Sequence, residues 1–168
     1  DICLNYCQSQ VALAHQQNNS LAEATFYKLI GGTYYYIPQK ENAIAYWKKC
    51  IEIAEPNNYY TLLAQCYHNV GVISYEKLDY KLAEKYFIKA IDLSKQNNDT
   101  NSATFSLHYR LLATTYDAEN MTDKAESIFK EIIAKSRAVK DSANLVESLL
   151  FYTNVLKKKN EFEKAILL

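Results

Sequence analysis

The sequence predicts an all-α fold, a solenoid of antiparallel helix pairs stacked into an α-α superhelix. A pattern with a period of 40–42 residues runs through the 168-residue chain, and such a period is typical of helical repeat arrays. Apolar side chains recur every three to four residues, as they do on one face of a helix. Only three glycines and two prolines occur, which favours long helices joined by short turns.

The repeat is clearest in columns of small and aromatic residues. A small residue recurs at Gly31, Gly71, Ala113 and Thr153. An alanine follows twelve residues after each of them, at Ala43, Ala83, Ala125 and Ala165. An aromatic residue follows four residues later in three repeats, at Trp47, Phe87 and Phe129. The small residues let paired helices approach closely and the aromatic fills the wedge toward the next repeat, so neighbouring repeats must stack to bury this surface.

The helices follow one another in pairs along the chain. We expect them near residues 21–36, 40–55, 64–77, 80–96, 102–118, 122–138, 143–158 and 161–168. The segment Leu78–Asp79 is too short for anything but a tight helix-helix turn. Ser20 with Glu23 has the spacing of a capping box, so Ser20 is expected to be the N-cap of the helix near 21–36.

The repeat phase predicts a single domain over residues 1–168, with about three full repeats and a partial repeat at each end. The expected units are 1–19 (the second helix of a preceding repeat), 20–57, 58–99, 100–140 and the partial repeat 141–168. Residues 6–20 align without gaps on residues 86–100, two repeats further on. We therefore expect the chain to be a piece of a longer protein, and self-association through the exposed ends of the stack is left open.

These columns resemble the tetratricopeptide repeat family. The residues that match best are Tyr67, Val70, Gly71, Ala83, Phe87 and Ala90. The family's unit is about 34 residues, so each repeat here is longer; the closing proline occurs only as Pro56, and Thr153 replaces the small residue in the last repeat. Repeats of 40–42 residues resemble those of bacterial transcription regulators and sensor kinases.

Composition and motifs argue against several classes of function. Nineteen basic and nineteen acidic residues cancel, so the broad basic surface of a nucleic-acid-binding protein is not expected. No apolar run approaches the roughly 18 residues of a membrane span. Cys7 and Cys50 fit buried apolar positions better than a metal site, Cys66 and His68 lack a second ligand pair, and no catalytic constellation or phosphate-binding glycine loop stands out. We therefore expect no enzyme, cofactor or metal, no membrane contact, and a cytoplasmic location, with the exported sensor portion of a membrane protein as the alternative.

The resemblance implies a concave groove, lined by the first helix of each repeat, that binds a protein or peptide. Polar and aromatic side chains beside the packing stripe are the candidate groove residues. They are Lys28, Tyr35, Gln65, His68, Asn69, Tyr75, Arg110, Thr114 and Asn154. Amides can bond a peptide backbone, lysine and arginine can hold carboxylates, and tyrosines offer flat contact area.

Some members of the family clamp a partner's C-terminal carboxylate with lysine and asparagine side chains. Lys28 and Asn69 stand at corresponding places, but Gly32 replaces the second asparagine and Leu107 and Leu111 replace the basic pair. The sequence thus predicts a non-catalytic binding scaffold. The alternative is a sensory or regulatory domain of a bacterial transcription regulator or sensor kinase.

Overall fold

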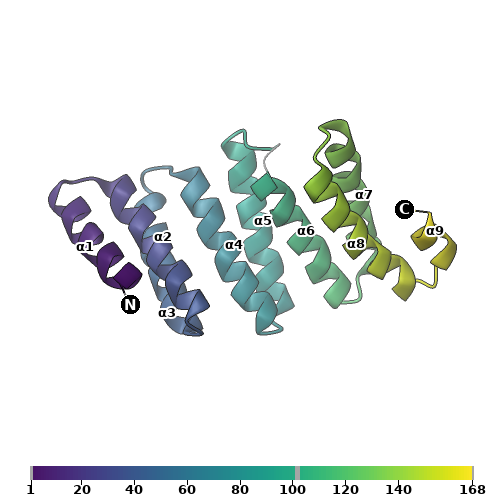
Figure 1. Ribbon diagram of the computed structural model, residues 1–168, viewed down its shortest axis with the longest axis horizontal. Coiled ribbons are helices and arrows are strands. Elements are labelled where there is room, and N and C mark those ends of the chain that lie inside the picture. Colours follow the sequence, from purple (N-terminus) through teal and green to yellow (C-terminus); the bar gives the residue numbers. More distant parts are fainter. Residues whose placement is uncertain (1, 101–102, 168) are drawn as a thin grey trace.

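The computed structural model describes residues 2–100 and 103–167, and within these ranges every regular element is an α-helix. The helices are α1 (Ile2–Gln16), α2 (Ser20–Tyr36), α3 (Lys40–Ala54), α4 (Tyr60–Glu76), α5 (Tyr80–Gln96), α6 (Ala103–Ala118), α7 (Thr122–Ala138), α8 (Ser142–Lys158) and α9 (Phe162–Ile166). They form one row of neighbouring antiparallel helices, which confirms the predicted α-α solenoid (Figure 1).

Several predicted helix boundaries differ from the structure, most of them by a single residue. The largest difference is at the helix expected from residue 64, which begins at Tyr60. The predicted helix start at residue 102 and helix end at 168 lie outside the described residues. The capping box at Ser20 is wrong by one residue, since Asn19 is the N-cap and its side chain accepts from the Ala22 N–H at 3.0 Å. Ser20 Oγ bonds the Tyr59 hydroxyl instead, at 2.8 Å.

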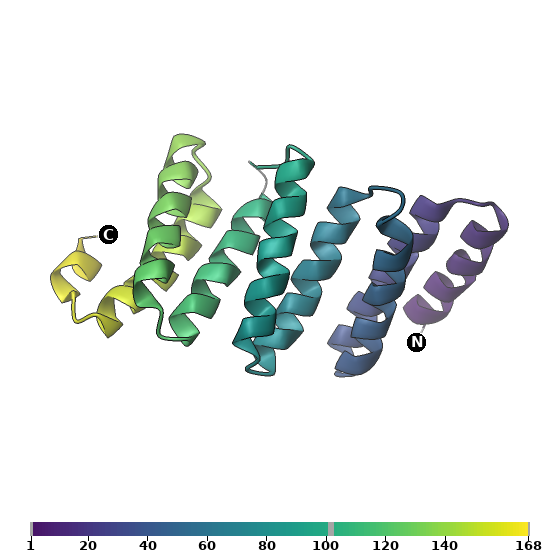
Figure 2. The ribbon, with the colours of Figure 1, turned by 180° about the vertical axis from the view of Figure 1, so that it is seen from behind.

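Helices of the same kind meet on one side of the stack only. The backbones of the first helices α2, α4, α6 and α8 each approach that of the next one, whereas within the described ranges the backbones of the second helices α1, α3, α5 and α7 stay apart. Seen from behind, α3, α5 and α7 lie in front of their partners (Figure 2). Because the first helices are closer together, they line the inner, concave side of the superhelix.

The columns read from the sequence are the packing core of the stack. Ala43, Ala83 and Ala125 are fully buried, and Trp47, Phe87 and Phe129 are buried beside them. A Cβ added at Gly71 would lie 2.8 Å from a Phe87 ring carbon, and one at Gly31 would overlap the Trp47 indole. The two glycines are therefore needed for the close approach of first and second helix.

The connections between helices share one backbone device. A residue with positive φ follows seven of the described helices, at Asn18, Asn58, Leu78, Asn98, Asn120, Lys140 and Asn160. At Leu78, its N–H donates to the Tyr75 carbonyl and the Asp79 N–H to the Ser74 carbonyl, both at 2.9 Å, which is a Schellman motif. Asp79 is at once the N-cap of α5, accepting from the Leu82 N–H at 3.1 Å. At six of the seven turns, the residue after the left-handed one is likewise the N-cap of the next helix; after Asn98, α6 begins only at Ala103.

The α2–α3 connection departs from this device because Pro38 stands where the left-handed residue would be. Proline has a fixed negative φ and no N–H. The outer hydrogen bond persists, from the Gln39 N–H to the Tyr34 carbonyl at 3.1 Å. The overall turn is thus kept without the inner bond.

None of the described helices combines the length and apolar character that crossing a bilayer requires.

Candidate binding groove

The concave side holds a cavity of about 470 Å³ between α2, α4 and α6. Its lining residues come from three successive first helices: Lys28, Leu29, Gly32, Thr33, Tyr36, Gln65, His68, Asn69, Thr104, Leu107 and His108. A second cavity of about 310 Å³ continues along α2 and α4, sharing Gly32, Tyr36, His68 and Asn69 and adding Tyr35, Trp47 and Val72. Together they form a groove of mixed polar and apolar character, which we call the α2–α4–α6 groove.

Five of the predicted groove residues line these cavities. The larger cavity is lined by Lys28, Gln65, His68 and Asn69, and the smaller one by Tyr35, His68 and Asn69. Lys28 Nζ donates to Gln65 Oε1 at 2.7 Å and so ties α2 to α4. The Tyr35 hydroxyl donates to Glu76 Oε1 at 2.5 Å, and this bond, with burial, raises the pKa of Tyr35 to about 12. The Asn69 side chain lies at the centre, on the wall shared by both cavities.

The other four predicted residues do not line either cavity. Arg110 is buried and turns toward α8, where it donates to Asn144 Oδ1 at 3.2 Å and pairs with Glu147 Oε2 at 2.6 Å. The Thr114 hydroxyl donates to the Arg110 carbonyl at 2.9 Å. The Tyr75 ring packs on Tyr80, with centroids 5.4 Å apart. Asn154 is exposed on α8.

The floor of the groove is a pair of histidines from adjacent first helices. The rings of His68 on α4 and His108 on α6 lie 4.8 Å apart between centroids, and the Phe87 ring lies 5.9 Å from His68. His108 is fully buried. Burial lowers the pKa of His108 to about 4, and burial together with the charge of His108 lowers the pKa of His68 to about 3. Both imidazoles are therefore neutral near pH 7.

His108 is a groove residue that the sequence analysis missed. It occupies the column of Phe26 and Cys66, which reads as a buried packing position. Leu29 and Leu107 were missed as well, because apolar side chains on the inner face give no polar signal, and so were Thr33, Tyr36 and Thr104. The repeat columns alone therefore give no signal that His108 lines the groove.

The carboxylate clamp implied by the family resemblance is incomplete in the groove. Lys28 and Asn69 do line the cavity, but Gly32 and Leu107, which stand where the clamp has polar groups, line it too. No cluster of three or more metal-binding side chains occurs within residues 2–100 and 103–167.

The tetratricopeptide repeat family model matches residues 59–97, the span of α4 and α5. The columns of that pair return in α2–α3 and α6–α7, where alanine and aromatic side chains are buried at the same positions. The α4–α5 repeat thus matches the tetratricopeptide family, and its neighbours have the same helix-pair architecture. No curated protein matches the sequence of the chain.

Solved structures share this tetratricopeptide fold at low sequence identity. Apo RapI aligns with a TM-score of 0.86 at 19% identity, covering 98% of this chain and 45% of RapI. BtubC (BKLC) from P. vanneervenii aligns with a TM-score of 0.80 at 18% identity, covering 88% of this chain and 61% of BtubC. The apo form of the quorum sensor NprR from B. thuringiensis aligns with a TM-score of 0.61 at 15% identity, covering 96% of this chain and 56% of NprR. The chain thus spans less than two thirds of each of these proteins.

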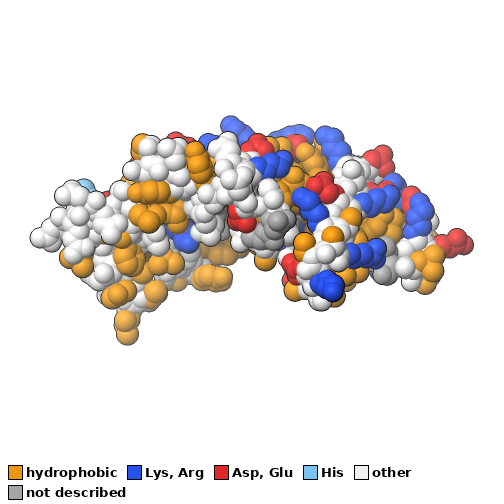
Figure 3. Space-filling model, turned by 90° about the horizontal axis from the view of Figure 1, so that it is seen from above, with side chains coloured by type: hydrophobic (Ala, Val, Ile, Leu, Met, Phe, Trp, Pro, Cys, Tyr) orange, Lys and Arg blue, Asp and Glu red, His pale blue; other side chains and the backbone are white. Residues whose placement is uncertain are grey.

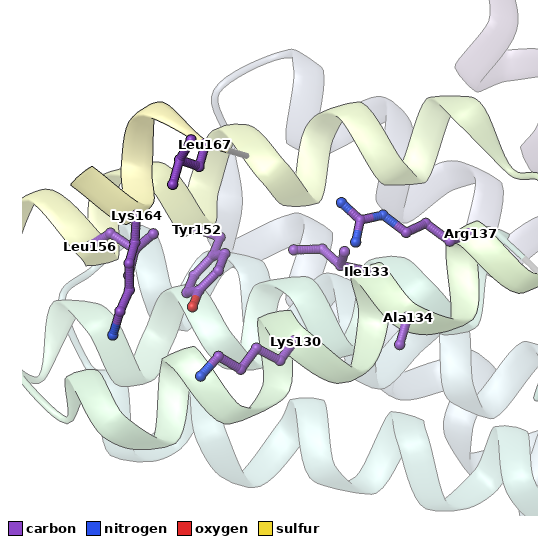
Figure 4. Close-up of a pocket in the computed structure, with 8 residues that line it drawn as sticks. All are labelled: Lys130, Ile133, Ala134, Arg137, Tyr152, Leu156, Lys164 and Leu167. Atoms are coloured by element: carbon purple, nitrogen blue, oxygen red, sulfur yellow. The ribbon is translucent and has the colours of Figure 1, made fainter. Parts of the chain in front are cut away.

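A further cavity of about 360 Å³ lies at the C-terminal end of the tetratricopeptide stack. Its walls are Lys130, Ile133, Ala134 and Arg137 of α7, Tyr152 and Leu156 of α8, and Lys164 and Leu167 (Figure 4). The α9 helix has five residues where the second helices α3, α5 and α7 have 15 to 17, so it covers only part of the α7–α8 surface. This cavity belongs to the end of the stack and is separate from the α2–α4–α6 groove.

Proposed function

We propose that the protein is a non-catalytic scaffold that binds a segment of a protein or peptide in the α2–α4–α6 groove. The observation that carries this proposal is the cavity of about 470 Å³ to which three successive first helices contribute both amide and apolar side chains. Asn69 and Gln65 can bond an extended backbone through donor and acceptor. Leu29, Tyr36 and Leu107 supply the apolar contact that a side chain of the ligand would cover.

Binding to a randomised peptide array tests this proposal. Leu29→Glu places a charge at the groove wall, and Leu21→Glu is its matched control, because Leu21 is on the same helix and similarly exposed (49% against 45%) but lines neither cavity. We expect Leu29→Glu to abolish binding, Asn69→Ala to weaken it roughly tenfold through the loss of hydrogen bonds, and Leu21→Glu to leave it unchanged. Equal binding by Leu29→Glu and Leu21→Glu would remove the groove as the site.

A second candidate is a sensory domain, supported by the likeness of the fold to a quorum sensor solved in its apo form. A sensory domain must change shape when its ligand binds, whereas a rigid scaffold need not. Small-angle scattering with and without an array-selected peptide distinguishes the two. An unchanged radius of gyration, together with unchanged hydrogen exchange in α4 and α6, would eliminate the sensory reading.

A further inference from the structure

Three buried imidazole nitrogens at the groove floor have no hydrogen-bond partner in the described chain. They are Nδ1 of His68 and both ring nitrogens of His108. A neutral imidazole carries one donor and one acceptor, and leaving such groups unpaired away from water costs roughly 1–3 kcal/mol each. Since both side chains line the large cavity, a group bound there is within reach of the pair.

The wall around this pair is rich in donors and has no acid. None of the eleven residues that line the large cavity is Asp or Glu, while Lys28 supplies an ammonium, Gln65 and Asn69 supply amides and Thr104 a hydroxyl. Elsewhere on the described chain basic groups are mostly matched by carboxylates, such as Lys40 by Glu76 and Arg110 by Glu147. Lys28 is bonded to an amide oxygen instead, so its charge is not neutralised by Gln65.

The other elements packed around the histidines bring no counter-charge to them. Burial is the first cause of both lowered pKa values, and the remaining cause for His68 is His108; no charged group of α3, α5, α7 or α8 contributes. Arg110, on the same helix as His108, is held by Asn144 and Glu147 on α8. Asp99, which lines an adjoining small cavity with Gln65 and Thr104, is not a cause of either lowered pKa.

We propose that the α2–α4–α6 groove recognises a carboxylate of an acidic peptide, and that the His68–His108 pair takes up a proton from solvent when this carboxylate binds. A carboxylate accepts hydrogen bonds from Lys28 and from a protonated imidazole, and it makes the charged imidazole favourable where burial alone makes it unfavourable. Binding and protonation are then linked, so that affinity for the acid rises as pH falls. This inference rests on the proposed function and adds the chemistry of the ligand to it.

The test uses three small probes with the full chain: N-acetyl-glutamate N-methylamide, its glutamine analogue, and N-acetyl-glutamine as the free acid. Calorimetry gives affinities from about pH 7.5 to about pH 5.5, and NMR of the histidine Cε1–H groups reports protonation at the same time. We expect the glutamate probe to bind about tenfold more tightly per pH unit below about pH 6.5. The signals of His68 and His108 should shift together with binding, and the glutamine amide should bind at least tenfold more weakly.

Binding of the free acid in place of the glutamate probe would overturn the proposal, because the groove would then recognise a peptide terminus and not an acidic side chain. Equal affinity for the glutamate and glutamine amides, affinity independent of pH, or histidine signals that do not move would each overturn it. These outcomes are distinct from failure of the groove itself, which the Leu29→Glu and Leu21→Glu pair reports.

Two variants separate recognition from folding. His108→Phe places in α6 the residue that α2 has in the same column, Phe26, and it removes both unpaired nitrogens. His68→Gln, at a partly buried position, keeps the inner face polar. We expect both to lose the pH dependence and to weaken the glutamate probe about tenfold or more. His15→Gln is the control, because His15 is exposed on α1 beside Glu23 and does not line the groove. A pH dependence retained in both groove variants would contradict the proposal.

Discussion

The α2–α4 and α6–α8 interfaces use the same repeat positions for opposite purposes. Lys28 and Arg110 occupy one column of the first helices, and Gln65 and Glu147 occupy another. Lys28 meets a neutral amide beside an open cavity, whereas Arg110 is buried against Asn144 and a carboxylate. The difference teaches that an inward-facing basic residue becomes either a groove residue or a cross-link, depending on its partner in the next repeat.

Charged residues are also more numerous in the C-terminal half of the chain than in the half with the groove. Of the nineteen basic residues, fourteen follow residue 80, as do twelve of the nineteen acidic ones. In the view from above, charged side chains gather over the half that holds α6–α9, while the α1–α4 half shows mainly uncharged and apolar side chains (Figure 3). The C-terminal half is therefore held together by ion pairs to a greater extent than the half with the groove.

The largest expected effect comes from breaking the buried cross-link. Arg110→Met keeps most of the side-chain volume but leaves Asn144 without its partner and Glu147 without its counter-charge. We expect the free energy of unfolding to fall by about 2–3 kcal/mol, below the range for a fully buried pair because Glu147 is 57% exposed. Urea unfolding measures this. A loss below about 0.5 kcal/mol would show that the pair is a surface ion pair in energetic terms.

The interface between α4 and α6, which holds His68 and His108, should make the stability of the fold depend on pH. Their folded-state pKa values, about 3 and about 4, lie below the ordinary value of 6.5, so the unfolded chain binds protons first as pH falls. Stability is then full above pH 6.5 and lost progressively as pH falls toward 4, by about 1–2 kcal/mol per histidine at pH 5. Urea midpoints at pH 7 and pH 5 measure the slope, and the double variant His68→Gln/His108→Phe should flatten it.

Titration of the carboxylates falls below the range from pH 7 to pH 5 in which the histidines change stability. Hydrogen bonds from Lys130 and Lys159 lower the pKa of Glu126 to about 2, and that contribution is lost only as pH falls from the ordinary range near 4.5. A pH slope between 7 and 5 that is unchanged in the double variant would contradict the assignment to the histidines.

The α4–α6 interface can also be given a cross-link like the one between α6 and α8. His68 and Leu107 stand in the columns of Arg110 and Glu147, so His68→Arg with Leu107→Glu rebuilds the cross-link one repeat earlier. We expect a coupling energy of about 1 kcal/mol in a double-mutant cycle, together with loss of peptide binding in the groove. Binding retained by a coupled double variant would show that the ligand does not need the space between α4 and α6.

The smallest effect is expected at the α2–α4 interface, beside the groove. Lys28→Met removes one hydrogen bond to a partly exposed amide, and we expect it to cost no more than about 0.5 kcal/mol. Urea unfolding beside Arg110→Met provides the comparison. A cost as large as that of Arg110→Met would mean that the two interfaces are equivalent and that the contrast drawn between them is wrong.

Much of the fold could be predicted because its columns are repeated. Gly71, Ala83 and Phe87 each have counterparts in the neighbouring repeats, and the structure buries them together. The N-cap of α2 could not be fixed to one residue from the sequence, since Asn19 and Ser20 are both good caps and the turn bonds decide between them.

The groove was harder to predict because it depends on neighbours in other repeats. Arg110 has the right column for a groove residue, but its direction is set by Asn144 and Glu147 in α8. His68 and His108 are 40 residues apart where the repeat step is 42, so they fall in different columns and their contact is not visible from the repeat alone.

The turns at Asn18, Leu78 and their counterparts have a consequence for how such a chain can grow. Each unit of about 40 residues follows a left-handed residue with the same turn hydrogen bonds, at Asn18, Asn58, Asn98 and Lys140, so successive units close in the same local geometry. Duplication or deletion of one unit in the gene would therefore join without a new linker. The α2–α3 turn, with Pro38, lies inside a unit and would be copied with it.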